Sequence, residues 1–435
     1  MNFVNPSIRK YPRYSVSVTL QLDVMASGSF ATLLRRSAPL LLGAAVLSAC
    51  SSPTPPPGAE KRFVGSAACQ PCHQDIYSRW KTTLMANVVQ DPSARPEAIL
   101  GDFSTPNPLV TFRKEDVAFT YGSKWKQRYF TRRGDDYFVF GAQWDVRAKV
   151  WRRYYVEKGT DWWAEHYPAD QMQRPTGPLC DGCHSVNYDI KAKTVTEWNV
   201  GCEKCHGAGS LHVQYPIAAT TVNPARLDAV RADDVCIQCH SQGQPRTKPL
   251  EDVYYDWPVG YQPGDRLSDV WMLEEHHLGK ETFTHWPDGN AHKNRMQGND
   301  YVQSQMSVKG VRCYACHDVH GTPYPAALRQ PDNLVCAQCH NSQLQPGPPG
   351  PIEQHTQHKA GSEGSKCAAC HMPLIARTVG NVSVRSHTFK FVSPVTTKRL
   401  GVPNPCTSCH TDRSNDWAIE ELKKWPSVSP WRVAE

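Results

Sequence analysis

The sequence predicts a chain of mostly coil and short helices wrapped around covalently held groups, with a small antiparallel β segment near residues 109–140. Three observations support this fold class. Sixteen of the 17 cysteines fall into eight short C-x-x-C-H motifs that are spread along the chain. The 35 prolines and 28 glycines favour loops over long regular elements. The mean hydropathy of −0.54 leaves little apolar side chain for a conventional core, so the held groups must supply part of it.

The eight motifs, called boxes 1 to 8 in chain order, share one spacing and therefore one chemistry. C-x-x-C-H is the attachment sequence of c-type haem. Two thiols one helical turn apart bond to one haem, and the following histidine is the proximal ligand of its iron. Disulfides and zinc half-sites are alternatives for paired cysteines, but neither needs a histidine directly after the second cysteine.

The sequence therefore predicts a multihaem cytochrome c with eight molecules of haem c. The boxes, each with its two attachment cysteines and its proximal histidine, are Cys69-Cys72-His73, Cys180-Cys183-His184, Cys202-Cys205-His206, Cys236-Cys239-His240, Cys313-Cys316-His317, Cys336-Cys339-His340, Cys367-Cys370-His371 and Cys406-Cys409-His410.

The interval between boxes 1 and 2 has the pattern of antiparallel strands. Short alternating runs predict strands at Leu109–Phe112, Val117–Tyr121, Lys126–Thr131 and Tyr137–Phe140, with a polar turn at Gly134 before the last. The interval is rich in aromatic residues, which we interpret as core in preference to an electron path. Near the end of the chain, a short amphipathic helix is predicted over Asp416–Trp425.

The first 50 residues have the features of an export signal. Met25 is an alternative start, followed by Arg35-Arg36 and an apolar stretch from Ala38 to Leu47 that is too short to span a bilayer. The sequence ending in Cys50 resembles a lipoprotein cleavage box, with Cys50 as the lipidated N-terminus. Ordinary cleavage, which would leave a free cysteine, is the alternative. We expect an exported lipoprotein in the periplasm or at the cell surface, with the outer membrane favoured.

The distribution of boxes divides the chain into six segments. They are a signal peptide with lipobox (1–50), a Pro-rich tether (51–62), box 1 with the β-rich segment (63–170), boxes 2–4 (171–245), a box-free segment that supplies histidine ligands (246–310), and boxes 5–8 with the C-terminal helix (311–435). The formal net charge is +7. Haem propionates are the expected partners of the basic residues, so no nucleic acid is expected to bind.

Several motifs resemble the nitrifier tetrahaem cytochrome c family and larger multihaem cytochromes with doubled C-x-x-C-H motifs. The resemblance covers most of the mature chain and implies electron transfer between redox partners. It is carried by Cys69–Ala86, Cys202–His212, Cys313–His320, Cys367–Pro373 and Pro405–Asp412.

Ten histidines lie outside the boxes, enough to give every haem iron a second axial ligand. Met85 stands where the resemblance places a ligand histidine for haem 1, and packing in a core is its alternative role. His166 and His285 compete with Met85 for the last position. The distal candidates are Met85, His212, His276, His292, His320, His355, His358 and His387.

Two classes of function remain at this point, and the electron carrier is favoured over the enzyme. A carrier would pass electrons from periplasmic donors to an acceptor in the outer membrane or outside the cell. An octahaem reductase of nitrite, hydroxylamine or tetrathionate would need one open iron, for which haem 1 is the only visible candidate. A subunit of a cytochrome filament, or another oligomer, is a third possibility.

Overall fold

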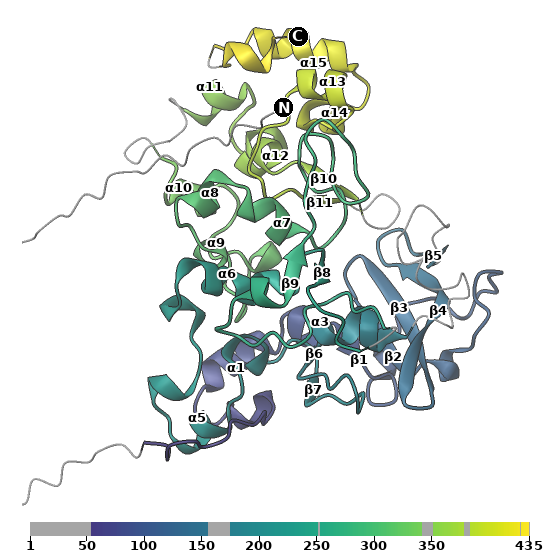
Figure 1. Cartoon of the computed structure of the whole chain (residues 1–435). Helices are drawn as coiled ribbons and strands as arrows, with labels where there is room; N and C mark the ends of the chain where they lie inside the picture. Colours follow the sequence, from purple (N-terminus) through teal and green to yellow (C-terminus); the bar gives the residue numbers. More distant parts are fainter. Residues whose placement is uncertain are drawn as a thin grey trace, which may run out of the picture. The chain divides into compact units, whose positions relative to one another are not determined.

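The largest regular element of this computed structural model is a five-stranded antiparallel sheet (Figure 1). Its strands pair in chain order, with no crossover between them. They are β1 (Val89–Gln90), β2 (Phe119–Tyr121), β3 (Lys126–Arg133), β4 (Asp136–Asp145) and β5 (Val150–Arg153). The structure describes residues 54–154, 175–250, 253–341, 351–377, 383–426 and 428–434. The predicted signal peptide, Cys50 and His166 lie outside these ranges.

The β3–β4 hairpin fixes the register of the sheet. Arg133 pairs with Asp136 across a two-residue turn, and Gly134 in that turn has φ 61°. Glycine at the first central position is typical of type II′ turns, whose twist matches that of the two strands. The sheet extends beyond the predicted segment, because β4 continues to Asp145 and β5 adds a further strand.

The segment Leu109–Phe112 is not a strand, which corrects the sequence prediction. Asn107 folds the backbone into a turn instead: its side chain accepts a hydrogen bond from the Leu109 N–H at 3.0 Å, and its carbonyl accepts one from Val110 N–H at 3.0 Å. Local side-chain bonds of this kind compete with strand pairing. Phe112 nevertheless reaches the core, where its ring stacks on that of Phe140 with centroids 3.9 Å apart.

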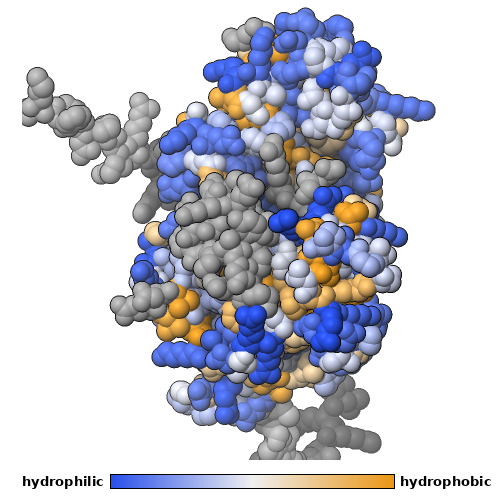
Figure 2. All heavy atoms as spheres, turned by 90° about the vertical axis from the view of Figure 1, so that its right-hand side faces the viewer, coloured by the Kyte–Doolittle hydropathy of each residue, from blue (hydrophilic) through white to orange (hydrophobic). Residues whose placement is uncertain are grey.

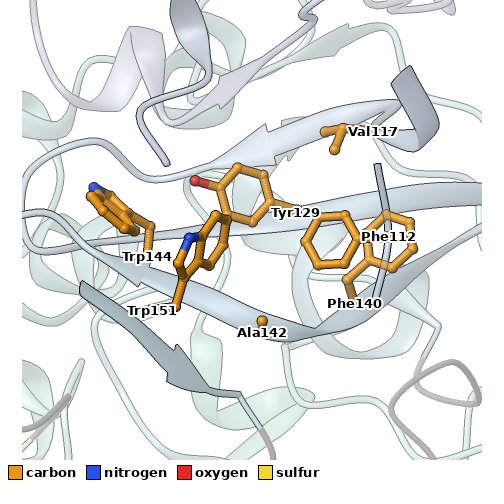
Figure 3. Close-up of a cluster of buried hydrophobic side chains, with 7 residues drawn as sticks. All are labelled: Phe112, Val117, Tyr129, Phe140, Ala142, Trp144 and Trp151. Atoms are coloured by element: carbon orange, nitrogen blue, oxygen red, sulfur yellow. The ribbon is translucent and has the colours of Figure 1, made fainter. Parts of the chain in front are cut away.

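The sheet carries an aromatic core of its own (Figure 3). The ring of Trp151 lies against those of Tyr129 and Trp144, with centroids 5.3 and 5.2 Å away, and its indole N–H donates to the carbonyl of Asp102 at 2.9 Å. The predicted role of the aromatic residues as core therefore agrees with the structure for Trp144 and Trp151, but not for Trp125, which is 38% exposed. The buried members are Phe112, Val117, Tyr129, Phe140, Ala142, Trp144 and Trp151.

The rest of the described chain consists of short helices, paired two-stranded segments and loops, as predicted. The longest helices have nine residues. Of the described helices, none has the length and apolar character needed to cross a membrane. The helices are α1 (Gln74–Trp80), α3 (Gly182–His184), α4 (Glu203–His206), α5 (Ser210–Gln214), α6 (Ala229–Ile237), α7 (Gln297–Val302), α8 (Gln305–Val308), α9 (Cys313–Cys316), α10 (Leu334–Ala337), α11 (Ile352–Thr356), α12 (Cys367–His371), α13 (Pro394–Leu400), α14 (Pro405–Cys409) and α15 (Asn415–Lys423).

Three small antiparallel pairs complete the regular structure. They are β6 (Ser185–Val186) with β7 (Glu197–Trp198), β8 (Gly243–Pro245) with β9 (Trp271–Leu273), and β10 (Leu374–Arg377) with β11 (Ser383–Arg385).

Apolar packing away from the sheet is limited to small clusters. One of them contains only Trp286, Ile375, Val392 and Val402 as fully buried members. Figure 2 shows the same balance at the surface, where hydrophilic residues cover much of the coloured area and apolar residues form separate patches. Side-chain burial alone therefore gives this part of the chain a modest driving force for folding.

The aromatic core predicts a large stability effect at one position. We expect Phe112→Ala to destabilise the sheet by about 3–5 kcal/mol, because it removes a buried ring and leaves a cavity. The lower thermal unfolding temperature can be measured by circular dichroism. Val150→Ala, an exposed position of β5, is the matched control and should change stability by less than about 0.5 kcal/mol. Equal effects of the two changes would contradict the assignment of Phe112 to the core.

Candidate functional site

Each box forms a single helical turn, which brings its two cysteines to one side. In boxes 1, 3, 4, 5, 6 and 8 the backbone N–H of the histidine donates to the carbonyl of the first cysteine, with N···O distances of 2.8–3.1 Å. Box 7 lies within α12, and box 2 runs into α3 from a π-helical turn at Gly177–Asp181. Side chains three positions apart on a helical turn are neighbours, as double attachment to one haem requires.

The alternative uses of paired cysteines find no support in the described residues. No disulfide joins the sixteen box cysteines, all of which lie within the described ranges. Within the described ranges, no group of three or more His, Cys, Asp or Glu side chains is arranged to hold a metal ion.

Five box histidines face a second histidine ring at nearly constant distance. In each pair one imidazole belongs to a box and the other to a distal candidate. The pairs, with centroid distance and angle between ring planes, are His73–His212 (6.3 Å, 14°), His206–His320 (6.1 Å, 23°), His317–His387 (6.5 Å, 27°), His371–His355 (6.2 Å, 7°) and His410–His358 (6.1 Å, 36°).

This distance is the one that a shared metal ion requires. A metal ion holds an imidazole nitrogen at about 2.0 Å, and the ring centre lies about 1.1 Å behind that nitrogen, so imidazoles on opposite sides of one ion have centres roughly 6.2 Å apart. The observed range of 6.1–6.5 Å agrees with this value. The angle between the planes is free, because each ring can rotate about its bond to the metal. The residues therefore fit haem iron with two axial histidines at five boxes.

Hydrogen bonds at Nδ1 leave Nε2 as the metal-binding nitrogen in six of these rings. A hydrogen bond to a neighbouring carbonyl, hydroxyl or carboxylate fixes ring orientation in the way that metal-ligating histidines require. The contacts are His206 to Val222 O (2.7 Å), His212 to Thr220 Oγ1 (3.1 Å), His317 to Ala326 O (2.9 Å), His320 to Asp318 Oδ1 (3.0 Å), His358 to Thr356 O (2.5 Å) and His387 to Arg385 O (3.1 Å).

Burial keeps several of these rings neutral. Desolvation lowers the pKa of His206, His317 and His371, and it lowers the pKa of His387 to about 4. The charged imidazolium is disfavoured away from water, and only neutral imidazole can bind a metal. The electrostatics of the pairs therefore favour the protonation state that ligation needs.

Four of the five pairs join segments that are far apart in the sequence, and the exception is His355 with His371. His212, just after box 3, faces box 1, and His320, just after box 5, faces box 3. His387 faces box 5, while His355 and His358 face boxes 7 and 8. The sequence predicts these five histidines as distal candidates but does not indicate which box each one faces.

The other distal candidates have different surroundings. His276 faces His285, which belongs to no box, at 6.0 Å and 57°, and both line a cavity of about 570 Å³. The Nε2 of His292 lies 2.8 Å from the carbonyl of Thr282. Met85 lies half-buried in a short 3₁₀ helix, and the ring that stacks against His73 is that of His212. The ligand roles of these residues stay predictions.

Box 2 has an environment unlike the five paired boxes. Among the described residues, no second imidazole ring stacks against His184; the Tyr121 ring lies 5.3 Å from it instead. The hydroxyl of Tyr121 donates to Asp181 Oδ1 at 2.6 Å, and that of Thr176 donates to Asp181 Oδ2 at 2.7 Å. Burial raises the pKa of Asp181 to about 7.

Three cations lie near His184. Burial, followed by the charges of Arg295, Arg128 and Lys204, lowers the pKa of the imidazole to about 4. The positive charges come from three separate segments of the chain, and sequence analysis missed them for that reason. Within box 2 itself, the sequence offered one indication of unusual surroundings, namely the carboxyl group of Asp181, which the structure shows to be buried.

Comparisons with known proteins find similarity to multihaem c-type cytochromes. Residues 306–345 match the doubled CXXCH motif, and residues 145–207 match the family of cytochrome c554 and c-prime. A probable tetraheme c-type cytochrome of Nitrosomonas europaea is 27% identical over 152 residues, which cover 35% of this chain and 60% of that protein. The dissimilatory sulfite reductase MccA of Wolinella succinogenes is 21% identical over 401 residues, covering 72% of this chain and 51% of that protein. The chain thus spans between about half and three fifths of the length of these two relatives.

A solved structure shares the fold over most of the chain. The outer cell wall cytochrome OcwA superposes with a TM-score of 0.67 at 26% sequence identity, covering 83% of this chain and 86% of that one. The similarity extends over many boxes and is not limited to single motifs.

The paired rings predict the effect of removing one distal histidine. We expect His320→Ala to leave the haem content unchanged and to convert one haem from low spin to high spin, because the iron at box 3 loses its second imidazole. Electron paramagnetic resonance and carbon monoxide binding by the reduced protein would measure the change. His277→Ala, an exposed histidine, is the matched control and should alter neither signal. An unchanged spin state in His320→Ala would contradict the pairing of His320 with box 3.

Proposed function

We propose that this chain, a multihaem c-type cytochrome, holds eight haem c groups and transfers electrons between periplasmic donors and an acceptor in the outer membrane or outside the cell. The observation that carries this proposal is the set of five histidine pairs with centroids 6.1–6.5 Å apart. A haem iron with two axial histidines has no position left for a substrate, and it changes oxidation state with little change in its ligands. This is the chemistry of a carrier.

The protein's own residues would hold and tune each haem. The two cysteines of a box would form the covalent attachment. At the five paired boxes the box histidine and its facing histidine would bind the iron, and the six hydrogen bonds at Nδ1 would hold their rings in place. When bound, the haem supplies one-electron chemistry. Surface boxes would allow exchange with partners, since Cys72, Cys339 and Cys409 are exposed.

We further propose that the protein is exported and anchored by lipid at Cys50. This proposal rests on the apolar stretch that ends in the lipobox and on the similarity to a cytochrome described as belonging to the outer cell wall. The outer membrane is the favoured site. Redox proteins of the periplasm or outer membrane are the proposed partners, and assembly into an oligomer or filament would extend the electron path.

The intact mass of the mature protein tests the cofactor load and the anchor together. We expect eight haem increments on a chain that starts at residue 50 and carries acyl groups. The control is protein made in a strain without cytochrome c maturation, which should lack every haem increment. A mass short of eight haems would overturn the stoichiometry, and an unmodified residue 50 would overturn the anchor.

A reductase is the second candidate function, and box 2 is the observation that favours it. A buried site with three nearby cations and no facing imidazole among the described residues suits a small anion bound to an open iron. The sulfite reductase among the relatives gives a precedent for such chemistry in that protein. The open position proposed from the sequence at box 1 is less favoured, since His73 faces His212 there.

Ligand binding separates the two functions. If box 2 is open, its iron should bind carbon monoxide in the reduced protein, and the protein should turn over nitrite, hydroxylamine or tetrathionate. Arg128→Gln should then weaken binding of nitrite about 10-fold or more, because a charged hydrogen-bonding partner is lost, while leaving the affinity for neutral carbon monoxide unchanged. Absorbance titrations measure both affinities. Absence of carbon monoxide binding would exclude the reductase and leave the carrier.

A further inference from the structure

Box 4 (Cys236–His240) contacts box 2 through their second cysteines. The Sγ of Cys183 lies 3.9 Å from the carbonyl of Gln238, and the Sγ of Cys239 lies 4.0 Å from the carbonyl of Cys183. The two thiols are themselves in side-chain contact. Two attachment turns therefore pack directly against each other.

Boxes 3 and 5 also contact box 4, through other residues. The Gln238 amide of box 4 donates to the carbonyl of Lys204 in box 3 at 3.1 Å, and the thiols of Cys205 and Cys236 are near one another. On the other side, the thiol of Cys236 contacts that of Cys313, the first cysteine of box 5. Box 4 thus has three neighbouring boxes.

The remaining boxes follow in a single line. Cys69 of box 1 contacts Cys202 of box 3, and the backbone N–H of Cys202 donates to Ser66 Oγ, beside box 1, at 2.8 Å. Beyond box 5, Cys316 lies near enough to Cys339 for the charge of one thiol to affect the pKa of the other, Cys336 contacts Cys367, and Cys370 lies similarly near Cys406.

We infer that box 4 is a three-way junction in the electron path, which runs through boxes 1, 3, 4, 5, 6, 7 and 8 in that order, with box 2 joined to it at box 4. This inference rests on the proposed function, because contacts between attachment turns become electron steps only when each box carries a haem. It differs from the order of the boxes in the sequence, in which box 2 would lie between boxes 1 and 3. The Lys204 ammonium of box 3 also donates to the carbonyl of Gly182 in box 2, but the side-chain contact between attachment cysteines joins box 2 to box 4. Box 2 is then a side branch, and electrons arriving from either end of the line reach it through box 4.

Two largely buried guanidinium groups lie beside the junction, Arg295 near boxes 2 and 4 and Arg312 near boxes 4 and 5. Arg295 forms an ion pair with Asp256, and its charge acts on the cysteines of boxes 2 and 4. Arg312 precedes box 5 and forms an ion pair with Asp233, whose Oδ1 also accepts from the Cys313 N–H at 3.1 Å. The Asp233 carboxylate acts on Cys236 and Cys313, which belong to boxes 4 and 5.

These two residues give a test that locates the junction. Removing a buried positive charge favours the ferric state, so it lowers the reduction potential of the haems near it. We expect Arg295→Gln to lower the potentials of the haems at boxes 2 and 4, and Arg312→Gln to lower those at boxes 4 and 5. One haem should respond to both substitutions. Potentiometric titration of the full holoprotein, followed haem by haem by electron paramagnetic resonance, measures the shifts.

Controls separate charge from general damage to the structure. Arg113→Gln removes an exposed guanidinium from the sheet region and should shift no haem, while Arg295→Lys keeps the charge and should restore the potentials that Arg295→Gln lowers. Two separate sets of responding haems, with none in common, would overturn the junction. A haem count below eight in the unsubstituted protein would count against the proposed function instead, so the two failures are distinguishable.

A crystal structure of the holoprotein, with the iron positions located by anomalous scattering, would determine the spatial order of the haems independently. We expect the box 4 iron to have the irons of boxes 2, 3 and 5 as its nearest neighbours, and the box 2 iron to have only that of box 4. A box 2 iron placed between those of boxes 1 and 3 would overturn the branched order.

Discussion

The structure depends on one repeated constraint, a pair of imidazole rings whose centres are 6.1–6.5 Å apart. Each pair joins a box to a histidine from another part of the chain, so each iron bound between them would act as a cross-link. His73 and His212, for example, belong to segments separated by the whole β sheet in sequence. Metal ligation of this kind couples directly to folding, because the site does not exist in the unfolded chain.

This constraint explains how a chain with so little apolar core can hold one structure. The β sheet has its own aromatic core around Trp151 and Tyr129 and contains no box. The helical regions have only small clusters of buried apolar side chains, such as the one around Trp286. Small folds with limited cores commonly depend on covalent or metal cross-links, and here the attached haems would provide both. The sheet is thus stabilised by its buried aromatic side chains, whereas the regions that contain the boxes would be stabilised by their attached haems.

Box 2 shows how the same motif acquires a different environment. Its sequence spacing equals that of the other boxes, yet its histidine packs against Tyr121 and lies near three cations. Its cysteines meet those of box 4, which also meets boxes 3 and 5. Carrier and reductase are therefore compatible in one architecture, since a line of neighbouring boxes would deliver electrons to a branch with distinct chemistry.

The sequence alone determined the attachment chemistry, because each C-x-x-C-H motif is local and its cysteines and histidine lie within one helical turn. It also predicted the short helices, most of the central strands and the five histidines that face boxes. The predicted strand at Leu109–Phe112 was wrong because the Asn107 side chain accepts a hydrogen bond from the Leu109 N–H and holds the backbone in a turn. The alternating pattern of a strand does not reveal such a bond. Only the tertiary structure decided which histidine faces which box, that Arg128, Lys204 and Arg295 gather near box 2, and that box 4 touches three others. These are contacts between distant segments, and the spacing of residues along a chain carries no information about them.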